Sequence, residues 1–179
     1  MPDNILVFYG SYRSDRMGIR LADFIVKGLR ARGASVDFID AKAVGLPMLD
    51  RMYKEHPKGQ APEALETLAG KIRAADAFVF VTGEYNWGVQ PGLKNLTDHF
   101  LEEWFWRPAA IASYSAGRFS GVRSGTAWHS ILSEMGMVVV SSTLAAGASL
   151  KRAFPRWADD LAWWTNAARV QRATQAPPY

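Results

Sequence analysis

An apolar run passes into a polar loop and then into a helical pattern in Ile5-Leu-Val-Phe-Tyr-Gly-Ser-Tyr-Arg-Ser-Asp-Arg-Met-Gly-Ile19. Residues 5–8 are a short uninterrupted apolar run, which is typical of a strand buried on both faces of a parallel sheet. After Ile19, apolar residues recur at helical spacing, at Leu21, Phe24, Ile25 and Leu29. The loop therefore joins the carboxyl end of a strand to a helix start, where free N–H groups and the helix dipole favour a phosphate.

The loop contains two serines and two arginines, which are hydroxyl donors and cations suited to a phosphate. It is not a Walker loop, because the chain lacks the pattern G-x-x-x-x-G-K-[ST]. Gly10 and Gly18, with no glycine at the middle position, do not make the dinucleotide fingerprint G-x-G-x-x-G either. Taken alone, the loop is equally compatible with a phosphate cradle and with a solvent-exposed turn, so other motifs must decide.

Two further stretches repeat the succession of strand, loop and helix. Residues 77–82 are an apolar run followed by the loop 83–88, and Pro91 suits the first position of the next helix. Residues 109–114 indicate another strand, and 115–121 a loop of small residues before a third helix. Because all strands of a parallel sheet end at one edge, the three loops are expected to converge on a crevice, the usual ligand site of an open α/β fold.

Strands and helices alternate along the chain without an internal repeat, which predicts one α/β domain over residues 1–179. The expected strands are 5–8, 36–39, 77–82, 109–114 and 138–143. Five such strands predict a doubly wound parallel sheet in the order 2-1-3-4-5. The long irregular connection 41–59 is a lid candidate. We expect a last helix over 157–171 and a frayed tail over 176–179, where consecutive prolines prevent a helix.

The three loops carry the motifs Gly10-Ser-Tyr-Arg13, Glu84-Tyr-Asn86 with Pro91-Gly-Leu-Lys-Asn95, and Tyr114-Ser-Ala-Gly-Arg-Phe-Ser-Gly-Val-Arg123. Together they resemble the cofactor loops of the flavodoxin-like, NAD(P)H-dependent FMN reductases, a family that includes quinone, azo-dye and chromate reductases. The likeness covers residues 4–145 in register, and three motifs in the right order are far more specific than one. The resemblance implies a flavodoxin-like fold and bound FMN.

The resemblance also implies which residues hold FMN. The phosphate would be held by Ser11, Arg13, Met17, Gly18 and Ile19, with Arg16 helping. One edge of the isoalloxazine would be lined by Gly83, Glu84, Tyr85, Asn86 and Trp87, and the pyrimidine side by Ser115, Ala116, Gly117 and Gly121. Two positions depart from many relatives: Arg16-Met-Gly18 replaces Ser-x-Asn, and Gly83 replaces a proline.

By this resemblance we expect an NAD(P)H oxidoreductase that passes two electrons through FMN to a small-molecule acceptor, namely a quinone, azo compound, flavin or metal oxyanion. The flavin carries the chemistry, so no catalytic acid or base is required of the protein. Donor and acceptor would share one open ring face, which predicts ping-pong kinetics. Arg118 and Arg123 flank the third loop and would favour NADPH over NADH by meeting its 2′-phosphate. The alternative is that both arginines pair with acids or with a neighbouring subunit.

Composition agrees with this interpretation. The chain has 179 residues, of which 49% are hydrophobic and 21% charged, and this suits one compact domain. It contains no apolar span of about 18 residues and no secretory signal, so we expect a cytoplasmic protein that does not enter a membrane. Cysteine is absent, which excludes disulfides, a thiolate nucleophile and Cys-based metal sites. The net charge of +4 lacks an accompanying nucleic-acid-binding module, so no nucleic-acid partner is expected.

Other functions remain as alternatives. Ser113-Tyr-Ser-Ala-Gly117 imitates a nucleophile elbow, but no acid lies between Ser115 and the only later histidine, His129, which disfavours a serine hydrolase. The three histidines have no i, i+4 partner, and no metal site is expected. The same fold would also suit a flavin-binding electron carrier or a ligand-sensing protein that has lost its cofactor.

The stretch after Pro91 ends in Phe100-Leu-Glu-Glu-Trp-Phe-Trp106 and carries more large apolar side chains than one sheet face should need. We therefore expect them to be buried in a homodimer or a dimer of dimers, as in the family that the chain resembles. The alternative is that they pack in the core of a single chain.

Overall fold

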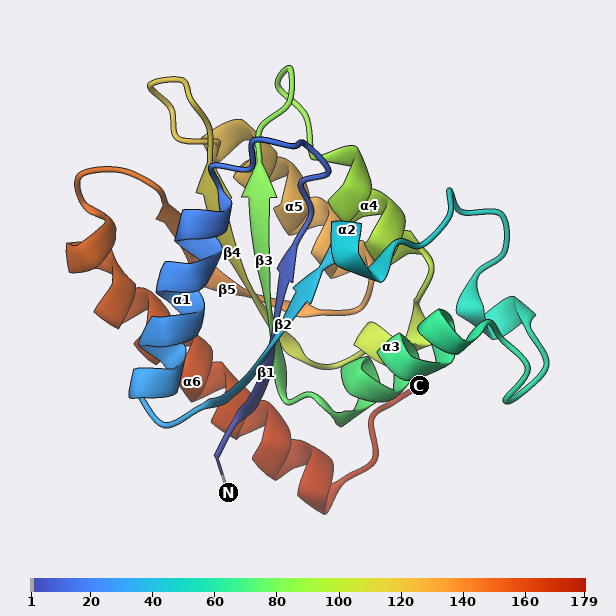
Figure 1. Cartoon of the computed structure of the whole chain (residues 1–179). Coiled ribbons are helices and arrows are strands. Elements are labelled where there is room, and N and C mark those ends of the chain that lie inside the picture. Colours follow the sequence, from blue (N-terminus) through green and yellow to red (C-terminus); the bar gives the residue numbers. More distant parts are fainter. Residues whose placement is uncertain (1) are drawn as a thin grey trace.

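The computed structural model describes residues 2–179 and places five parallel strands in one sheet (Figure 1). The strands are β1 (Asn4–Tyr9), β2 (Ser35–Asp40), β3 (Ala77–Gly83), β4 (Pro108–Tyr114) and β5 (Val138–Ala145). Their order is β2-β1-β3-β4-β5, which confirms the predicted order. Each strand is longer than predicted by only one or two residues, because backbone pairing at the strand ends extends beyond the apolar run that marks each strand in the sequence.

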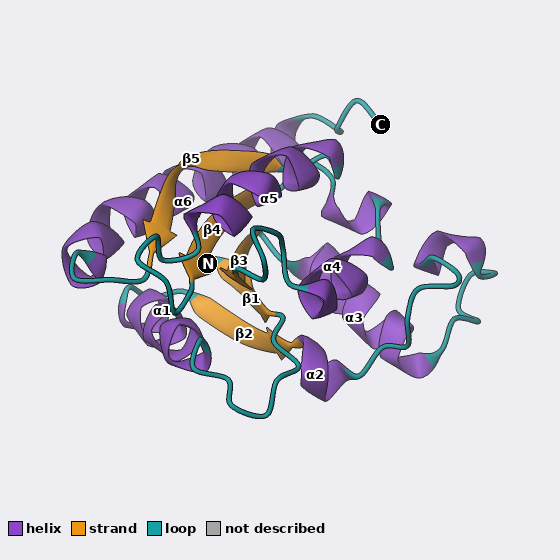
Figure 2. Ribbon diagram, turned by 90° about the horizontal axis from the view of Figure 1, so that it is seen from above, coloured by secondary structure: helices purple, strands orange, loops and turns teal. Residues whose placement is uncertain are grey.

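Helices cover both faces of the sheet, as Figure 1 shows from the side and Figure 2 from above. One face packs against α1 (Ile19–Ala31) and α6 (Leu150–Thr174). The other packs against α3 (Glu63–Ala74), α4 (Pro91–Asp98) and α5 (Val122–Glu134). The connections contain the short helices α2 (Ala41–Val44), η1 (Tyr53–Glu55) and η2 (Glu102–Trp104). With helices on both sides, β3 is buried along its whole length, which explains its unbroken apolar run.

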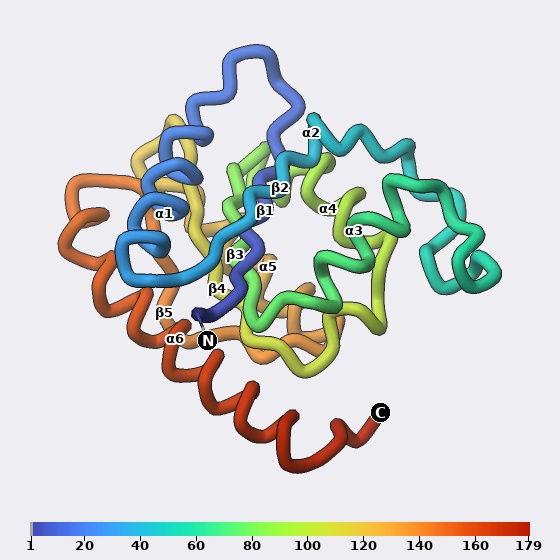
Figure 3. The backbone as a smooth tube through the Cα atoms, turned by 60° about the horizontal axis from the view of Figure 1, so that its bottom comes forward, coloured from blue at the N-terminus to red at the C-terminus, as the bar shows by residue number. Residues whose placement is uncertain are grey.

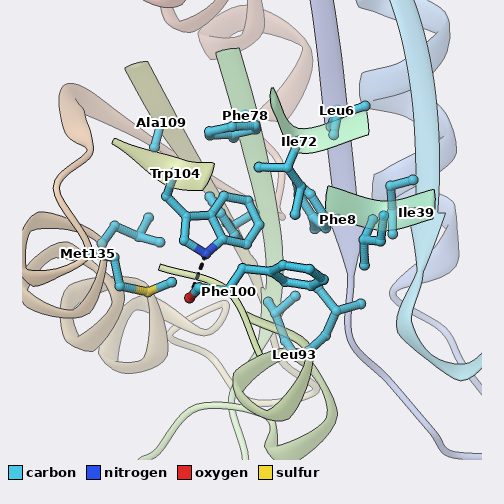
Figure 4. Close-up of a cluster of buried hydrophobic side chains, with 14 of the residues drawn as sticks. Leu6, Phe8, Ile39, Ile72, Phe78, Leu93, Phe100, Trp104, Ala109 and Met135 are labelled. Atoms are coloured by element: carbon cyan, nitrogen blue, oxygen red, sulfur yellow. Dashed lines mark hydrogen bonds between the residues drawn. The ribbon is translucent and has the colours of Figure 1, made fainter. Parts of the chain in front are cut away.

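The aromatic stretch after α4 belongs to the core of this chain. Phe100 is 1% exposed and Trp104 0%, and the Trp104 ring lies edge-on to Phe8 and Phe78 (Figure 4). The Trp104 indole N–H donates to the carbonyl oxygen of Phe100 over 3.2 Å. For Phe100 and Trp104 the expectation of burial in a dimer is therefore wrong, because the core of the single chain buries both. A homodimer remains a prediction that rests on the family resemblance alone.

Helix α6 starts at Leu150, well before the predicted start at residue 157. Pro155 lies inside it, where its missing N–H deprives only the carbonyl of exposed Lys151 of a partner. The chain end turns back onto Trp106: the ring of Tyr179 lies 4.8 Å from the Trp106 ring, and the indole N–H donates to the Tyr179 carbonyl oxygen over 3.2 Å. No helix in the described part of the chain combines the length and apolarity needed to span a bilayer.

The connection 41–59 lies beside α3 and α4 in Figure 3. Hydrogen bonds join it to α4 and to the residue that follows α4. The Asn95 side chain accepts from the backbone N–H of Leu49 over 2.9 Å and donates to the Pro47 carbonyl oxygen over 2.8 Å. The backbone N–H of Tyr53 donates to the His99 carbonyl oxygen over 2.7 Å. These bonds hold the connection at two places and argue against a lid.

Candidate functional site

The loops that follow β1, β3 and β4 meet at the carboxyl edge of the sheet (Figure 1). A cavity of about 690 Å³ lies between them and is closed on one side by the loop after β5. The convergence follows from the parallel topology, which places every strand end of this kind on the same edge.

The first loop, residues 10–18, contributes most of its residues to the lining of this cavity and contains free donors. Ser11 is 3% exposed, and its hydroxyl oxygen lies 3.3 Å from that of Tyr85. Among residues 2–179, no backbone N–H from position 11 to position 18 donates to a backbone carbonyl. Arg13 is exposed and forms no ion pair with any described residue. A run of free N–H groups beside a free guanidinium is a donor set that suits a phosphate.

Arg16, by contrast, has a partner within the chain. Its guanidinium donates to the Asp40 carboxylate, at the end of β2, over 2.5 Å and lies 5.7 Å from the Tyr9 ring centroid. The hydrogen bond to Asp40 raises the pKa of the Arg16 guanidinium. Because Asp40 offsets its charge, Arg16 is a weaker phosphate partner than Arg13.

The second loop contains a tight turn. Tyr85 and Gly88 exchange two backbone hydrogen bonds, of 3.1 and 2.9 Å. The two central residues, Asn86 and Trp87, have φ of +48° and +73°. A tryptophan in the left-handed region is unusual and costs on the order of 1 kcal/mol or more, so the turn is held by its surroundings. It presents the Trp87 side chain, 69% exposed, at the surface.

Tyr114, the last residue of β4, is a site residue that the sequence analysis missed. A Cβ atom on Gly18 would lie 2.0 Å from its ring and one on Gly83 2.8 Å, so both glycines make room for it. This explains the departure at Gly83, because a proline there would collide with the ring. The Tyr114 hydroxyl accepts from the Gln90 amide over 2.9 Å and donates to the Tyr9 hydroxyl over 3.4 Å. Burial, above all, raises the pKa of Tyr114, which keeps the phenol protonated.

The third loop is fixed at its base and open at its tip. Gly121 has φ of +79°, and a Cβ there would lie 2.4 Å from the Tyr114 carbonyl oxygen. The Ser113 hydroxyl donates to the Ser120 carbonyl oxygen over 3.0 Å. A Cβ on Gly117 would meet nothing nearer than the Ser115 hydroxyl oxygen at 3.8 Å. Gly121 is therefore needed by the fold, whereas the backbone at Gly117 is free to approach a ligand.

A buried polar cluster holds the second and third loops together from below. The Trp128 indole N–H donates to the Thr82 hydroxyl oxygen over 2.8 Å, and the Thr82 hydroxyl lies 2.8 Å from that of Ser124. All three side chains are completely buried. The cluster ties the end of β3 to the first turns of α5, which fixes the distance between the two loops that follow these elements.

An ion pair joins the same two loops at the surface. The Arg123 guanidinium donates to one carboxylate oxygen of Glu84 over 2.9 Å, and the Arg123 backbone N–H donates to the other over 3.2 Å. For Arg123 the structure thus favours pairing with an acid over a free phosphate contact. Arg118 forms no ion pair with any residue between 2 and 179, so it remains the candidate for the 2′-phosphate.

The cavity brings together ten of the predicted cofactor residues: Ser11, Arg13, Arg16, Met17, Gly18, Gly83, Glu84, Tyr85, Ser115 and Ala116. Five predicted residues do not line it: Ile19, Asn86, Trp87, Gly117 and Gly121. Six lining residues were missed: Asp15, Arg20, Leu21, Tyr114, Ala146 and Leu150. The last two follow β5, and the rule that all parallel strands end at one edge could have pointed to them.

The structure does not bring together the side chains that a serine hydrolase would need at Ser115. The Ser115 hydroxyl donates to the Gly117 carbonyl oxygen over 3.3 Å, and His129 contacts Thr143 instead. No group of three or more metal-ligating side chains occurs in the part of the chain that the structure describes.

Comparison with known proteins agrees with the fold and places the chain in a family. The model of the NADPH-dependent FMN reductase family matches residues 4–151. An NAD(P)H-dependent FMN reductase of Schizosaccharomyces pombe is 35% identical over 121 residues, which cover 62% of this chain and 56% of that protein. A probable NADPH:quinone oxidoreductase of Oryza sativa is 39% identical over 95 residues, or 51% of this chain and 46% of that protein. The chain thus spans about half the length of the curated relatives that it matches.

Solved structures show the same architecture. FerB, a flavoenzyme NAD(P)H:(acceptor) oxidoreductase from Paracoccus denitrificans, superposes with a TM-score of 0.72 at 20% identity, covering 94% of this chain and 98% of that one. A flavodoxin variant from Pseudomonas aeruginosa gives 0.55 at 17% identity, covering 94% and 99%. At these identities the likeness concerns the fold, and it confirms the predicted flavodoxin-like class.

Proposed function

Because the chain belongs to the NADPH-dependent FMN reductase family, we propose that it binds FMN in the cavity at the carboxyl edge of the sheet and oxidises NAD(P)H. Bound FMN would supply the redox chemistry, taking two electrons from the nicotinamide and passing them to a quinone, azo compound, free flavin or metal oxyanion. Donor and acceptor would occupy the site in turn, which is a ping-pong scheme.

One observation supports this proposal: the first loop, whose backbone N–H groups donate to no backbone carbonyl, lines a cavity of suitable size. The N–H groups of residues 11–18, the Ser11 hydroxyl and the unpaired Arg13 guanidinium match the oxygens of a phosphate. The volume of about 690 Å³ lies within the usual range of small-molecule and cofactor sites.

The residues of this chain would bind and orient the cofactor without supplying a proton. Glu84 is the acid of the second loop, but both its oxygens accept hydrogen bonds from Arg123 and its side chain is only 9% exposed. It therefore anchors the loop. Ser115 and Ala116 would lie beside the pyrimidine side of the ring, and Tyr114, protonated and fixed by Gln90, would form the floor.

A visible spectrum of the purified protein tests the proposal. We expect the absorption bands of oxidised flavin and their bleaching on addition of NADPH under exclusion of oxygen. A protein without these bands, after addition of FMN and desalting, would be a member of the fold that senses a ligand without flavin. Bands that NADPH leaves unchanged would indicate an electron carrier.

We further predict that NADPH is preferred over NADH. Arg118 would meet the 2′-phosphate through a charge-assisted contact worth roughly 1.5–3 kcal/mol, so Arg118→Ala should narrow the preference in kcat/KM by about tenfold or more. Comparing both donors for the wild type and the variant measures this. A wild-type preference for NADH, or an unchanged ratio in Arg118→Ala, would contradict the assignment of Arg118.

A further inference from the structure

The first loop depends on its side chains for its shape. Within residues 2–179, its N–H groups from position 11 to position 18 donate to no backbone carbonyl. A loop of this kind needs other contacts to keep one conformation, because ordering each residue costs conformational entropy. Two such contacts reach the same short segment, residues 40–41, where β2 ends and α2 begins.

Tyr12 forms the first of these contacts. Its hydroxyl donates to the Ala41 carbonyl oxygen over 2.8 Å. Its ring lies over Gly92 in α4, where a Cβ atom would stand 2.4 Å from the ring. The loop is therefore attached to α2 by a hydrogen bond and to α4 by close packing.

Arg16 forms the second contact, to a carboxylate that is itself held in place. One oxygen of Asp40 accepts from the Arg16 guanidinium over 2.5 Å, and the other accepts from the Lys42 backbone N–H over 3.0 Å and caps α2. The Asp40 side chain is only 13% exposed, so water and salt screen this pair less than they screen a pair on the open surface. Asp40 is therefore a fixed anchor for Arg16.

The two contacts lie on either side of Arg13, the free cation of the loop. Arg13 and Arg16 both line the proposed cofactor cavity, whereas Asp40 and Ala41 do not. With Tyr12 and Arg16 both attached, the backbone between them is held in one position. Donors that are fixed before a ligand arrives lose less entropy when they bind it.

We propose that Arg16 and Asp40 form a clamp that positions the first loop for the FMN phosphate. Arg16 is then a positioning residue that acts through Asp40, and not a ligand of the phosphate. This inference rests on the proposed function and assigns a role in it to an acid outside the cavity. Charge alone predicts the opposite effect for Asp40, because an acid near the site repels a phosphate and its neutralisation should strengthen binding.

The test is titration of the apo-protein with FMN, followed by flavin fluorescence, in Asp40→Asn. Asparagine is a good helix cap, so this variant keeps an oxygen for the Lys42 N–H but presents an amide NH₂ group to Arg16. We expect the Kd for FMN to rise by about fivefold or more, in keeping with the loss of one charge-assisted bond. An unchanged or lower Kd overturns the inference, because Arg16, once released, would then bind the phosphate at least as well.

A double-mutant cycle tests whether Arg16 acts through Asp40. The double variant Arg16→Gln/Asp40→Asn should bind FMN no more weakly than either single variant, because both substitutions break the same contact. Effects that add up in the double variant overturn the clamp. Arg16→Lys should recover part of the affinity, since it keeps a cation facing Asp40.

A control ligand and a control variant separate the clamp from a general distortion of the protein. Riboflavin lacks the phosphate, so Asp40→Asn should bind it as the wild type does, and equal weakening of both flavins overturns the inference. Asp37→Asn makes the same change earlier on β2, where the carboxylate pairs with Lys71 over 2.7 Å at the surface. This variant should bind FMN with the wild-type Kd.

Trypsin cleavage after Arg13, in protein without FMN, separates this inference from the proposed function. A loosened surface loop is cleaved faster, so Asp40→Asn should be cleaved faster than the wild type and Asp37→Asn. A wild type that takes up no FMN overturns the proposed function, while faster cleavage in Asp40→Asn still supports the clamp. A wild type that binds FMN, with Asp40→Asn unchanged in both assays, overturns the inference alone.

Discussion

We expect Gly121→Val to lower the melting temperature by roughly 10 °C, whereas Gly117→Val in the same loop leaves it close to the wild-type value. Gly121 has φ of +79°, where a β-branched residue is strained, and a Cβ would lie 2.4 Å from the Tyr114 carbonyl oxygen. Strain and overpacking each cost about 1–3 kcal/mol, so together they remove roughly 3–5 kcal/mol from the free energy of unfolding. For a chain of this size, each kcal/mol corresponds to about 2–4 °C.

Gly117→Val is the matched comparison, because the same side chain is introduced where the protein leaves room for it. The nearest atom to a Cβ at Gly117 is the Ser115 hydroxyl oxygen, 3.8 Å away. We expect this variant to fold normally and to lose FMN, since the valine would stand against the pyrimidine side of the ring. Thermal unfolding followed by circular dichroism, with flavin absorbance of the same samples, measures both effects. Full flavin occupancy in Gly117→Val would place residues 115–117 away from the ring.

The second large effect is expected at Arg13. Arg13→Ala should weaken FMN binding by about 1.5–3 kcal/mol, or roughly 10- to 150-fold in Kd, because a charge-assisted bond to the phosphate is lost. The fold should be unaffected, since Arg13 is exposed and has no ion pair among the described residues. Titration of the apo-protein with FMN, followed by flavin fluorescence, gives the affinity.

Two companion variants sharpen this result. Arg13→Lys keeps the positive charge but loses the planar guanidinium, which can donate two hydrogen bonds side by side. The affinity of this variant for FMN should therefore lie between those of the wild type and Arg13→Ala. Lys27→Ala removes an equal charge from an exposed position further along α1 and should leave the affinity unchanged. Equal affinities in Arg13→Ala and the wild type would remove Arg13 from the site and weaken the assignment of the first loop to a phosphate.

Much of the fold and the place of the site could be predicted from local patterns. The apolar runs of β1 and β3 and the polar loops after them are properties of neighbouring residues, because helices on both faces of a parallel sheet require unbroken apolar strands. The parallel order then brings the loops to one edge. Local patterns could not decide whether Phe100 and Trp104 lie in the core or in a subunit interface. Both locations require apolar residues, so the sequence looks the same in either case.

Local sequence patterns could not predict which partners the charged and aromatic side chains contact. Arg16 and Asp40 are 24 positions apart in the chain, and Glu84 and Arg123 are 39 apart. Each pair forms only because two strand ends lie side by side. These contacts refine the assignments of the arginines. The sequence offers both Arg13 and Arg16 as phosphate partners, but in the structure Arg16 is already paired with Asp40 and Arg13 is not.

The amino-acid sequence by itself determined the strand order, the three loops and the family, because these depend on apolar periodicity and on short motifs. Only the tertiary structure decided which arginines are free, that Tyr114 fills the space left by Gly18 and Gly83, and that Trp87 is stacked yet exposed. The physical reason is that electrostatic pairing and packing depend on distances in space between residues far apart in the chain, which a local pattern does not contain.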